Sequence, residues 1–126
     1  LRDHKSSTGK VGAVGFCYGG GICNALAVAH PDLAASVPYY GRQPRPEEVP
    51  AIKAPLLVQY AEVDERINAG WLPYQAALIA NQKKFEVHFY PGTQHGFHND
   101  STPRYDKAAA ELSWARTMDF FGKNLR

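Results

Sequence analysis

The sequence predicts an α/β fold built on a mainly parallel sheet of about four strands, with helices on both faces. Short apolar segments alternate along the chain with segments of helical periodicity. This order is typical of parallel sheets whose strands are joined by helical crossovers. One segment, residues 55–61 (Pro-Leu-Leu-Val-Gln-Tyr-Ala), is almost wholly apolar. A strand with two apolar faces belongs in a parallel sheet that helices cover on both sides.

The first half of the chain contains three predicted strands and one predicted helix. In chain order these are a strand over 10–16, a helix over 19–29, a strand over 34–40 and a strand over 55–61. The helix is rich in small residues, so it can pack very close to the sheet, and it ends at His30-Pro31. Pro38 removes one ladder hydrogen bond from the second strand. Gly and Pro residues mark the loop at 41–50.

The second half continues the alternation. Its predicted elements are a helix over 70–82, an alternating strand near the sheet edge over 85–90, a loop over 91–102 and a final helix. Pro73 fits the first of these helices only in its first turn. Thr102 suits the N-cap of the final helix, and Pro103 suits its first position. Steps of three and four residues predict the packing face of that helix: Tyr105, Ala108, Leu112, Ala115, Met118, Phe121 and Leu125.

Composition and charge exclude several classes of protein. The chain has 126 residues, enough for a single domain with a real core, and its formal net charge is +2. Charges of both signs are scattered, which argues against nucleic-acid or anionic-membrane binding. No apolar run approaches the roughly 20 residues of a membrane-spanning helix. Cys17 and Cys23 have neither zinc-site spacing nor a disulfide framework, which indicates a reducing compartment, the cytoplasm.

The strongest local signal is Gly15-Phe16-Cys17-Tyr18-Gly19, directly after the first predicted strand. It has the G-x-S-x-G pattern, with cysteine in place of serine, which presents a nucleophile on a sharp strand-to-helix turn. The dipole of the next helix favours the thiolate of Cys17, and the backbone N–H of Tyr18 faces the site of a developing oxyanion. The spacing fits no phosphate-binding loop. A buried, inert cysteine is the other interpretation.

Asp64 is the candidate acid. It follows the strand at 55–61, and the carboxyl ends of strands are where the sites of parallel sheets lie. There a carboxylate can hold a histidine in one tautomer and stabilise the imidazolium. Glu62 and Glu65 compete with Asp64 for this role, and simple solvation is the alternative for any one of the three.

His95 is the candidate base. It follows the strand at 85–90 in a loop where Gly92 and Gly96 allow the chain to turn back toward the sheet. His98 is its nearest rival. The chain order of nucleophile, acid and histidine is that of a hydrolytic triad. The sequence therefore predicts a triad of Cys17, Asp64 and His95.

On these residues the sequence resembles the C-terminal portion of the dienelactone hydrolase (carboxymethylenebutenolidase) family of α/β-hydrolases. The segments that carry the resemblance are residues 14–20, Tyr39-Tyr40-Gly41, Asp64 with Ile67-Asn68, and His95-Gly96-Phe97. The resemblance implies the C-terminal half of an α/β-hydrolase fold, forming one domain over residues 1–126 with the N-terminal strands missing. It also implies hydrolysis of a lactone or an ester through a cysteinyl acyl-enzyme, with no metal and no organic cofactor.

The resemblance also implies roles for individual residues. Cys17 would be the nucleophile, His95 the general base and acid, and Asp64 the acid that orients the histidine. Tyr39 and Tyr40 would line the substrate cleft. The missing strands would carry the second oxyanion-hole amide and an acidic residue that modulates the resting thiol.

Three interpretations of the function stay open. The first is an esterase or lactonase, the second a thioesterase or small acyl esterase of the same fold, and the third an inactive truncated remnant. A sheet that begins near residue 10 exposes a hydrophobic edge. We therefore hypothesise a fragment, a truncated gene product or one part of a two-chain fold, with self-association or a second chain supplying the N-terminal half.

Overall fold

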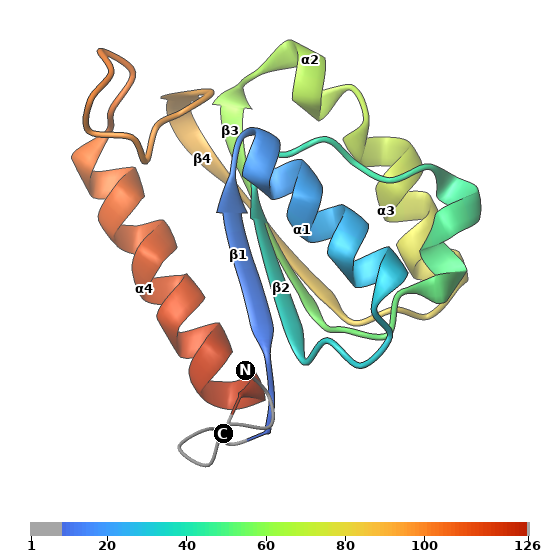
Figure 1. The fold of residues 1–126 in the computed structure, drawn as a ribbon. Helices are drawn as coiled ribbons and strands as arrows, with labels where there is room; N and C mark the ends of the chain where they lie inside the picture. Colours follow the sequence, from blue (N-terminus) through green and yellow to red (C-terminus); the bar gives the residue numbers. More distant parts are fainter. Residues whose placement is uncertain (1–8, 126) are drawn as a thin grey trace.

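The computed structural model describes residues 9–125, and it contains one four-stranded sheet in the order β1-β2-β3-β4. The strands are β1 (Gly12–Phe16), β2 (Ala35–Tyr39), β3 (Leu56–Val63) and β4 (Phe85–Gln94). Every neighbouring pair is parallel. The strands fan out with their carboxyl ends at the same edge of the sheet (Figure 1), which confirms the predicted α/β class.

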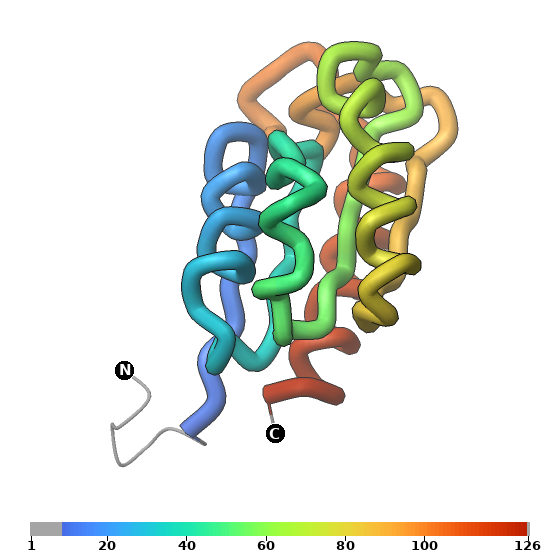
Figure 2. Tube along the Cα trace, turned by 90° about the vertical axis from the view of Figure 1, so that its right-hand side faces the viewer, coloured from blue at the N-terminus to red at the C-terminus, as the bar shows by residue number. Residues whose placement is uncertain are grey.

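Helices cover both faces of the sheet. The helical elements are α1 (Tyr18–Ala29), a 3-10 helix η1 (Pro46–Ala51), α2 (Glu65–Asn68), α3 (Trp71–Ala80) and α4 (Lys107–Asn124). Figure 2 shows α1, η1 and α3 side by side over one face, with α4 behind the sheet. Pro73 lies in the first turn of α3, where proline is tolerated.

β3 separates two hydrophobic clusters, one on each face. Leu56, Val58 and Tyr60 belong to the cluster under α1, η1 and α3. Leu57 and Ala61 belong to the cluster under α4. Alternate residues of a strand point to opposite faces, so the continuous apolar run of β3 serves both layers. This confirms the placement of β3 inside a parallel sheet.

Pro38 lies inside β2, which is an internal strand and not an edge. On either side of it, Ser36 donates its N–H to Pro55 O at 3.1 Å, and Tyr40 donates its N–H to Gln59 O at 2.6 Å. The N–H of residue 38 would lie between these two bonds, facing β3, and proline has none. One missing rung between β2 and β3 is therefore the cost of this residue, as the sequence predicts.

Two short helices and two strand extensions differ from the sequence-based prediction. The region 41–50, predicted as loop, runs into η1, and α2 follows β3 directly. Helices this short contain too little sequence for a periodic pattern. β3 and β4 also run beyond the predicted ends at residues 61 and 90. Both extensions carry the chain into the loops of the candidate site.

The predicted start of the final helix is wrong. α4 begins at Lys107, and its N-cap is Asp106, whose carboxylate accepts the N–H of Ala109 at 3.0 Å. Residues Thr102 and Pro103 belong to the preceding turns. An ionised carboxylate is a strong N-cap at the positive end of a helix, and this is what displaces the predicted cap.

Most of the predicted packing face of α4 is also wrong. Tyr105, Leu112 and Met118 are exposed, while the buried positions are small or polar: Ala109, Ala110, Ser113 and Thr117. Only Phe121 and Leu125 of the predicted stripe approach the sheet, where they pack beside Gly12. The reason is a buried polar network. Gln59 of β3 donates to Ser113 O at 2.9 Å and to the Thr117 hydroxyl at 3.2 Å.

The network extends to both neighbouring strands. The Tyr39 hydroxyl lies 2.9 Å from the Thr117 hydroxyl, and the Tyr90 hydroxyl donates to Gln59 Oε1. Hydrophobic periodicity does not register such a face, because its buried residues are hydroxyls and amides that satisfy one another. The network fixes α4 across β2, β3 and β4.

Within residues 9–125 no helix combines the length and apolarity needed to cross a bilayer. Cys17 and Cys23 are both free thiols, as predicted.

Candidate active site

The ends of β1, β3 and β4 bring the three predicted catalytic residues to one cavity. Cys17 follows β1, Asp64 follows β3 and His95 follows β4. All three line a cavity of about 830 Å³ at the carboxyl edge of the sheet. The remaining lining comes from the first turn of α1, the loop after β2 and the α2–α3 region: Tyr18, Tyr40, Arg42, Gln43, Pro44, Pro46, Arg66, Ile67, Gly70 and Pro73.

Cys17 occupies a strained backbone position. Its φ is 57° and its ψ is −117°, a combination that non-glycine residues adopt at an energetic cost. Two backbone bonds hold it there: Cys17 N–H to Tyr39 O at 3.1 Å, and Gly21 N–H to Cys17 O at 3.2 Å. The side chain therefore leaves the strand-to-helix turn at an angle that an ordinary turn does not provide.

The glycines around Cys17 act in different ways. A Cβ on Gly15 would lie well under 3.0 Å from the carbonyl of Gly19, so this glycine permits the turn to close. A Cβ on Gly19 itself would meet nothing within 4 Å. Gly20 is the position where the helix touches the sheet, because a Cβ there would collide with Tyr39 O. The close packing of α1 that its small residues predict therefore depends on Gly15 and Gly20.

Asp64 and His95 form the central pair of the site. His95 Nδ1 lies 2.6 Å from Asp64 Oδ2. The Asp64 side chain is only 8% exposed, whereas the His95 side chain is 35% exposed. A carboxylate can only accept a hydrogen bond, so Nδ1–H of His95 is the donor. This tautomer leaves Nε2 of His95 free to accept a proton.

Local structure positions both members of the pair. Asn68 of α2 donates to Ala61 O at 2.8 Å and to Glu62 O at 3.2 Å, which ties α2 to the end of β3. Gly96 follows His95 with φ of 86°, in the left-handed region that glycine adopts most readily. These contacts turn Asp64 and His95 toward each other.

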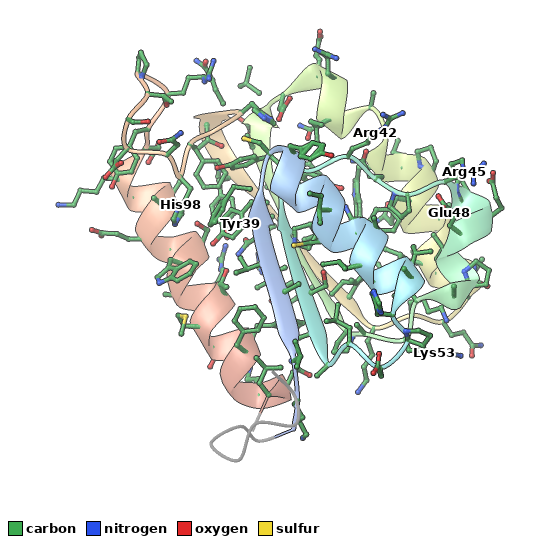
Figure 3. All side chains as sticks on the ribbon, in the orientation of Figure 1. Tyr39, Arg42, Arg45, Glu48, Lys53 and His98 are labelled. Atoms are coloured by element: carbon green, nitrogen blue, oxygen red, sulfur yellow. The ribbon has the colours of Figure 1, made fainter. Side chains whose placement is uncertain are left out.

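The rival residues lie elsewhere. Glu62 accepts the N–H of Gly92 at 2.9 Å and is exposed. Glu65 is an exposed first-turn residue of α2. His98 stacks on Phe16 with 4.8 Å between ring centroids, and Figure 3 shows it on the α4 side of the sheet. Asp64 and His95 are therefore the acid and histidine that the fold pairs.

Cys17 and His95 line the same cavity, and the hydrogen bond that the His95 ring makes is to Asp64. Burial raises the pKa of Cys17, the positive charge of Arg104 lowers it, and the negative charge of Asp64 raises it. The net effect is a pKa above the ordinary thiol value, so burial outweighs the thiolate preference that the helix terminus predicts. Nucleophile and base often approach fully only when substrate is bound.

The two neighbouring tyrosines have different surroundings. Tyr40 lines the cavity, and its ring lies 4.9 Å from the ring of His95. Tyr39 is fully buried, and its hydroxyl pairs with Thr117 on the α4 face. The fold thus brings Tyr40, but not Tyr39, to the cavity shared by Cys17 and His95. The Tyr18 N–H lies in the first turn of α1, where amides have no intrahelical acceptor.

Sequence reasoning did not single out two residues that shape this site. Gln43 donates to the Tyr60 hydroxyl at 2.9 Å and to Ile67 O at 2.8 Å, which fastens the loop after β2 to α2. The positive charge of Arg104, which lies in the loop before α4, lowers the pKa of Cys17. Nothing in the local pattern signals either residue, since both act through the tertiary fold. Among the described residues no three His, Cys, Asp or Glu side chains gather as metal ligands.

Comparisons with known proteins agree with this architecture. The dienelactone hydrolase family model matches residues 1–125. A Saccharolobus solfataricus protein assigned as a carboxymethylenebutenolidase is 40% identical over 121 residues, which is 94% of this chain and 47% of the relative. The chain spans about half the length of the curated relatives it matches.

Solved structures give the same result. A Klebsiella pneumoniae protein assigned as a dienelactone hydrolase superposes with a TM-score of 0.82 at 28% identity, over 88% of this chain and 51% of that one. The dienelactone hydrolase of Anabaena variabilis gives a TM-score of 0.68 at 27% identity, over 93% of this chain and 50% of that one. The parallel sheet and the sequence match lead to one conclusion: the chain belongs to the dienelactone hydrolase family.

Proposed function

We propose that this chain carries the nucleophile, base and acid of a hydrolase that cleaves carboxylic esters or lactones through a cysteinyl acyl-enzyme. The observation that carries the proposal is the 2.6 Å bond between His95 Nδ1 and Asp64 Oδ2, beside a strained Cys17 on the same cavity. A buried carboxylate, an oriented imidazole and an elbow nucleophile are the parts that acyl transfer requires.

The first half of the reaction acylates Cys17. Nε2 of His95 accepts the thiol proton as sulfur attacks the carbonyl carbon of the ester. The carbonyl π electrons move to oxygen, and the N–H of Tyr18 donates to the resulting oxyanion. When the intermediate collapses, the C–O bond to the leaving group breaks and His95 returns the proton to the departing alkoxide. In a lactone that alcohol stays attached to the acyl group.

The second half releases the acid. His95 accepts a proton from a water molecule, whose oxygen attacks the thioester carbonyl. The second oxyanion collapses, the C–S bond breaks, and the proton on His95 returns to the sulfur of Cys17. Asp64 keeps the imidazole oriented and stabilises its cationic form in both halves. No metal or organic cofactor takes part in this proposal.

Hydrolysis assays test the proposal directly. The purified chain, Cys17→Ala and Cys23→Ala would be assayed with a short-chain aryl ester and with an enol lactone. We expect Cys17→Ala to abolish hydrolysis and Cys23→Ala to retain it, because Cys23 is 3% exposed and does not line the cavity. Equal activity of the wild-type chain and Cys17→Ala would contradict the triad. A thioester substrate in the same assay separates esterase from thioesterase activity.

A second candidate function is that of one part of a larger assembly, inactive by itself. Large apolar side chains lie exposed on β1 and along α4: Val14, Leu112, Trp114 and Met118. Such side chains favour burial against another surface. We propose as their partner a second chain that corresponds to the half of the relatives that this chain does not cover, and association of this chain with itself as the alternative. Sedimentation velocity that finds only a 13.9 kDa monomer at all concentrations would count against self-association.

We also propose the cytoplasm as the compartment. The support is the pair of free thiols, Cys17 and Cys23, since oxidising compartments favour disulfides. Small-molecule esters or lactones, and neither nucleic acid nor membrane, are the proposed partners of the site.

A further inference from the structure

Tyr40 combines strain with complete burial beside the site. Its φ is 35°, so it is one of three described non-glycine residues with positive φ, and Cys17 is another. Its side chain is 0% exposed and packs against the rings of Tyr39, His95 and Phe97. Strained non-glycine residues persist where the surrounding structure holds them, and they concentrate at functional sites. The two strained residues Cys17 and Tyr40 follow adjacent parallel strands.

The Tyr40 hydroxyl is buried without a hydrogen-bond partner. The backbone of His98 is near enough to lower the pKa of the phenol, against the larger effect of burial, which raises it. The two groups still do not meet the geometry of a hydrogen bond. An amide N–H is in any case a donor, so it cannot accept the phenolic proton. A buried hydroxyl in this state carries an unrecovered desolvation cost.

Cys17 is the group that can accept a hydrogen bond from the Tyr40 hydroxyl. It packs against the hydrophobic cluster that contains Tyr40, and both residues line the same cavity. Burial raises the pKa of the Tyr40 phenol, and the negative charge of a Cys17 thiolate raises it further. The other charged or titratable groups near Cys17 are Arg104, Asp64 and His95, and the same cavity is also lined by Tyr18, Arg42 and Arg66. Of these, Asp64 repels a thiolate, and His95 must accept the thiol proton.

We propose that the Tyr40 hydroxyl donates a hydrogen bond to Cys17 sulfur when the thiolate forms. The otherwise unpaired O–H then gains an anionic acceptor. Tyr40 is then a positioning residue that lowers the cost of forming the nucleophile in an apolar setting. The significance for catalysis rests on the proposed role of Cys17, but the bond itself concerns only the free chain.

The test measures thiol reactivity, not hydrolysis, so it can fail independently of the proposed function. Alkylation of Cys17 by iodoacetamide would be followed by mass spectrometry from mildly acidic to alkaline pH, in a Cys23→Ala background. Hydrogen bonds to charged groups are among the stronger ones, so Tyr40→Phe should lower the alkylation rate at neutral pH about tenfold. The midpoint of the pH profile should move to higher pH.

Tyr39→Phe is the matched control. It removes a buried hydroxyl from the adjacent residue, but that hydroxyl is paired with Thr117 and does not line the cavity. We expect Tyr39→Phe to lower the melting temperature and to leave the alkylation profile in place. Tyr40→Phe should not lower the melting temperature, because its hydroxyl has no partner to lose. An unchanged midpoint in folded Tyr40→Phe, or an equal shift in Tyr39→Phe, overturns the proposal.

A second measurement covers the case in which Tyr40→Phe does not fold. Replacing the tyrosines of the chain with 3-fluorotyrosine makes every phenol more acidic and a stronger donor. The midpoint of Cys17 alkylation should then move to lower pH. A profile identical to that of the unsubstituted chain would contradict the hydrogen bond.

Discussion

Gly20 and Gly41 meet backbone to backbone where α1 crosses the end of β2. A Cβ on Gly41 would lie well under 3.0 Å from the carbonyl carbon of Gly20, and a Cβ on Gly20 would lie 2.9 Å from the Cα of Gly41. No flexible side chain is present there to move aside. The contact sets how closely the helix of the nucleophile approaches the sheet.

Alanine at position 20 should therefore be costly, and alanine at position 19 should not. We expect Gly20→Ala to lower the free energy of unfolding by about 1–3 kcal/mol, the usual range for overpacking. Gly19→Ala has open space for its methyl group, and a glycine-to-alanine change in a helix gains about 0.5–1 kcal/mol. Urea denaturation of the two variants checks this. Equal stabilities would mean that the helix can shift away from β2.

The buried polar network predicts that substitutions at two adjacent positions of α4 change the free energy of unfolding by very different amounts. Thr117→Val keeps the shape of the side chain but leaves the Tyr39 hydroxyl without its partner, which should cost about 1–3 kcal/mol. Met118→Ala removes a side chain that is 52% exposed and should change stability by no more than about 0.5 kcal/mol. Thermal unfolding monitored by circular dichroism measures both. A larger loss in Met118→Ala would restore the packing face predicted from periodicity.

The two cysteines should differ sharply in reactivity. Burial raises the pKa of Cys23 to about 11, with a smaller opposing effect of Ser36, and only 3% of this residue is exposed. Cys17 is partly exposed, and its pKa is also raised. Because only the thiolate reacts, alkylation of Cys17 should accelerate as pH rises through and beyond neutrality. Mass spectrometry of the native chain should find a single alkyl group, and a second only after denaturation.

The pairing of Asp64 with His95 is visible by NMR without any substrate. A proton shared between Nδ1 and a carboxylate oxygen at 2.6 Å should resonate far downfield of the amide region. Asp64→Asn should abolish or strongly shift that resonance, because the neutral amide accepts more weakly. Glu62→Gln is the control, since the Glu62 carboxylate accepts the backbone N–H of Gly92 at 2.9 Å, whereas His95 bonds Asp64. Loss of the signal in Glu62→Gln instead would make Glu62 the acid.

The part of the fold that the sequence predicts well depends on strong local patterns. The apolar run of β3 and the glycine elbow before α1 specify their own environment, because a two-sided apolar strand must be covered on both faces. The packing face of α4 differs from the predicted one because it depends on contacts with distant residues and not on a local pattern. The burial of Ser113 and Thr117 depends on a residue far away in the sequence, since Gln59 donates to Ser113 O and to the Thr117 hydroxyl.

The candidate site shows the same division. Cys17, Asp64 and His95 each follow a recognisable strand, and the rule that strand ends share an edge brings them together. Arg104 lies in a turn-rich loop whose path no periodicity predicts. Its effect on the pKa of Cys17 is therefore visible only in the three-dimensional structure. Tyr39 and Tyr40 are neighbours in sequence, but only Tyr40 lines the cavity, and its positive φ turns the chain at the strand end.

The strands that precede Cys17, Asp64 and His95 differ in their pairing within the sheet. β3, which precedes Asp64, pairs with both β2 and β4, whereas within residues 9–125 β1 and β4 each pair with one neighbour. Amide protons of β1 should therefore exchange with solvent before those of β3. Asp64 and His95 follow strands that pair with each other, whereas Cys17 follows a strand that pairs with neither of them. Loosening of β1 would then alter the attack of Cys17 more than the hydrogen bond between Asp64 and His95.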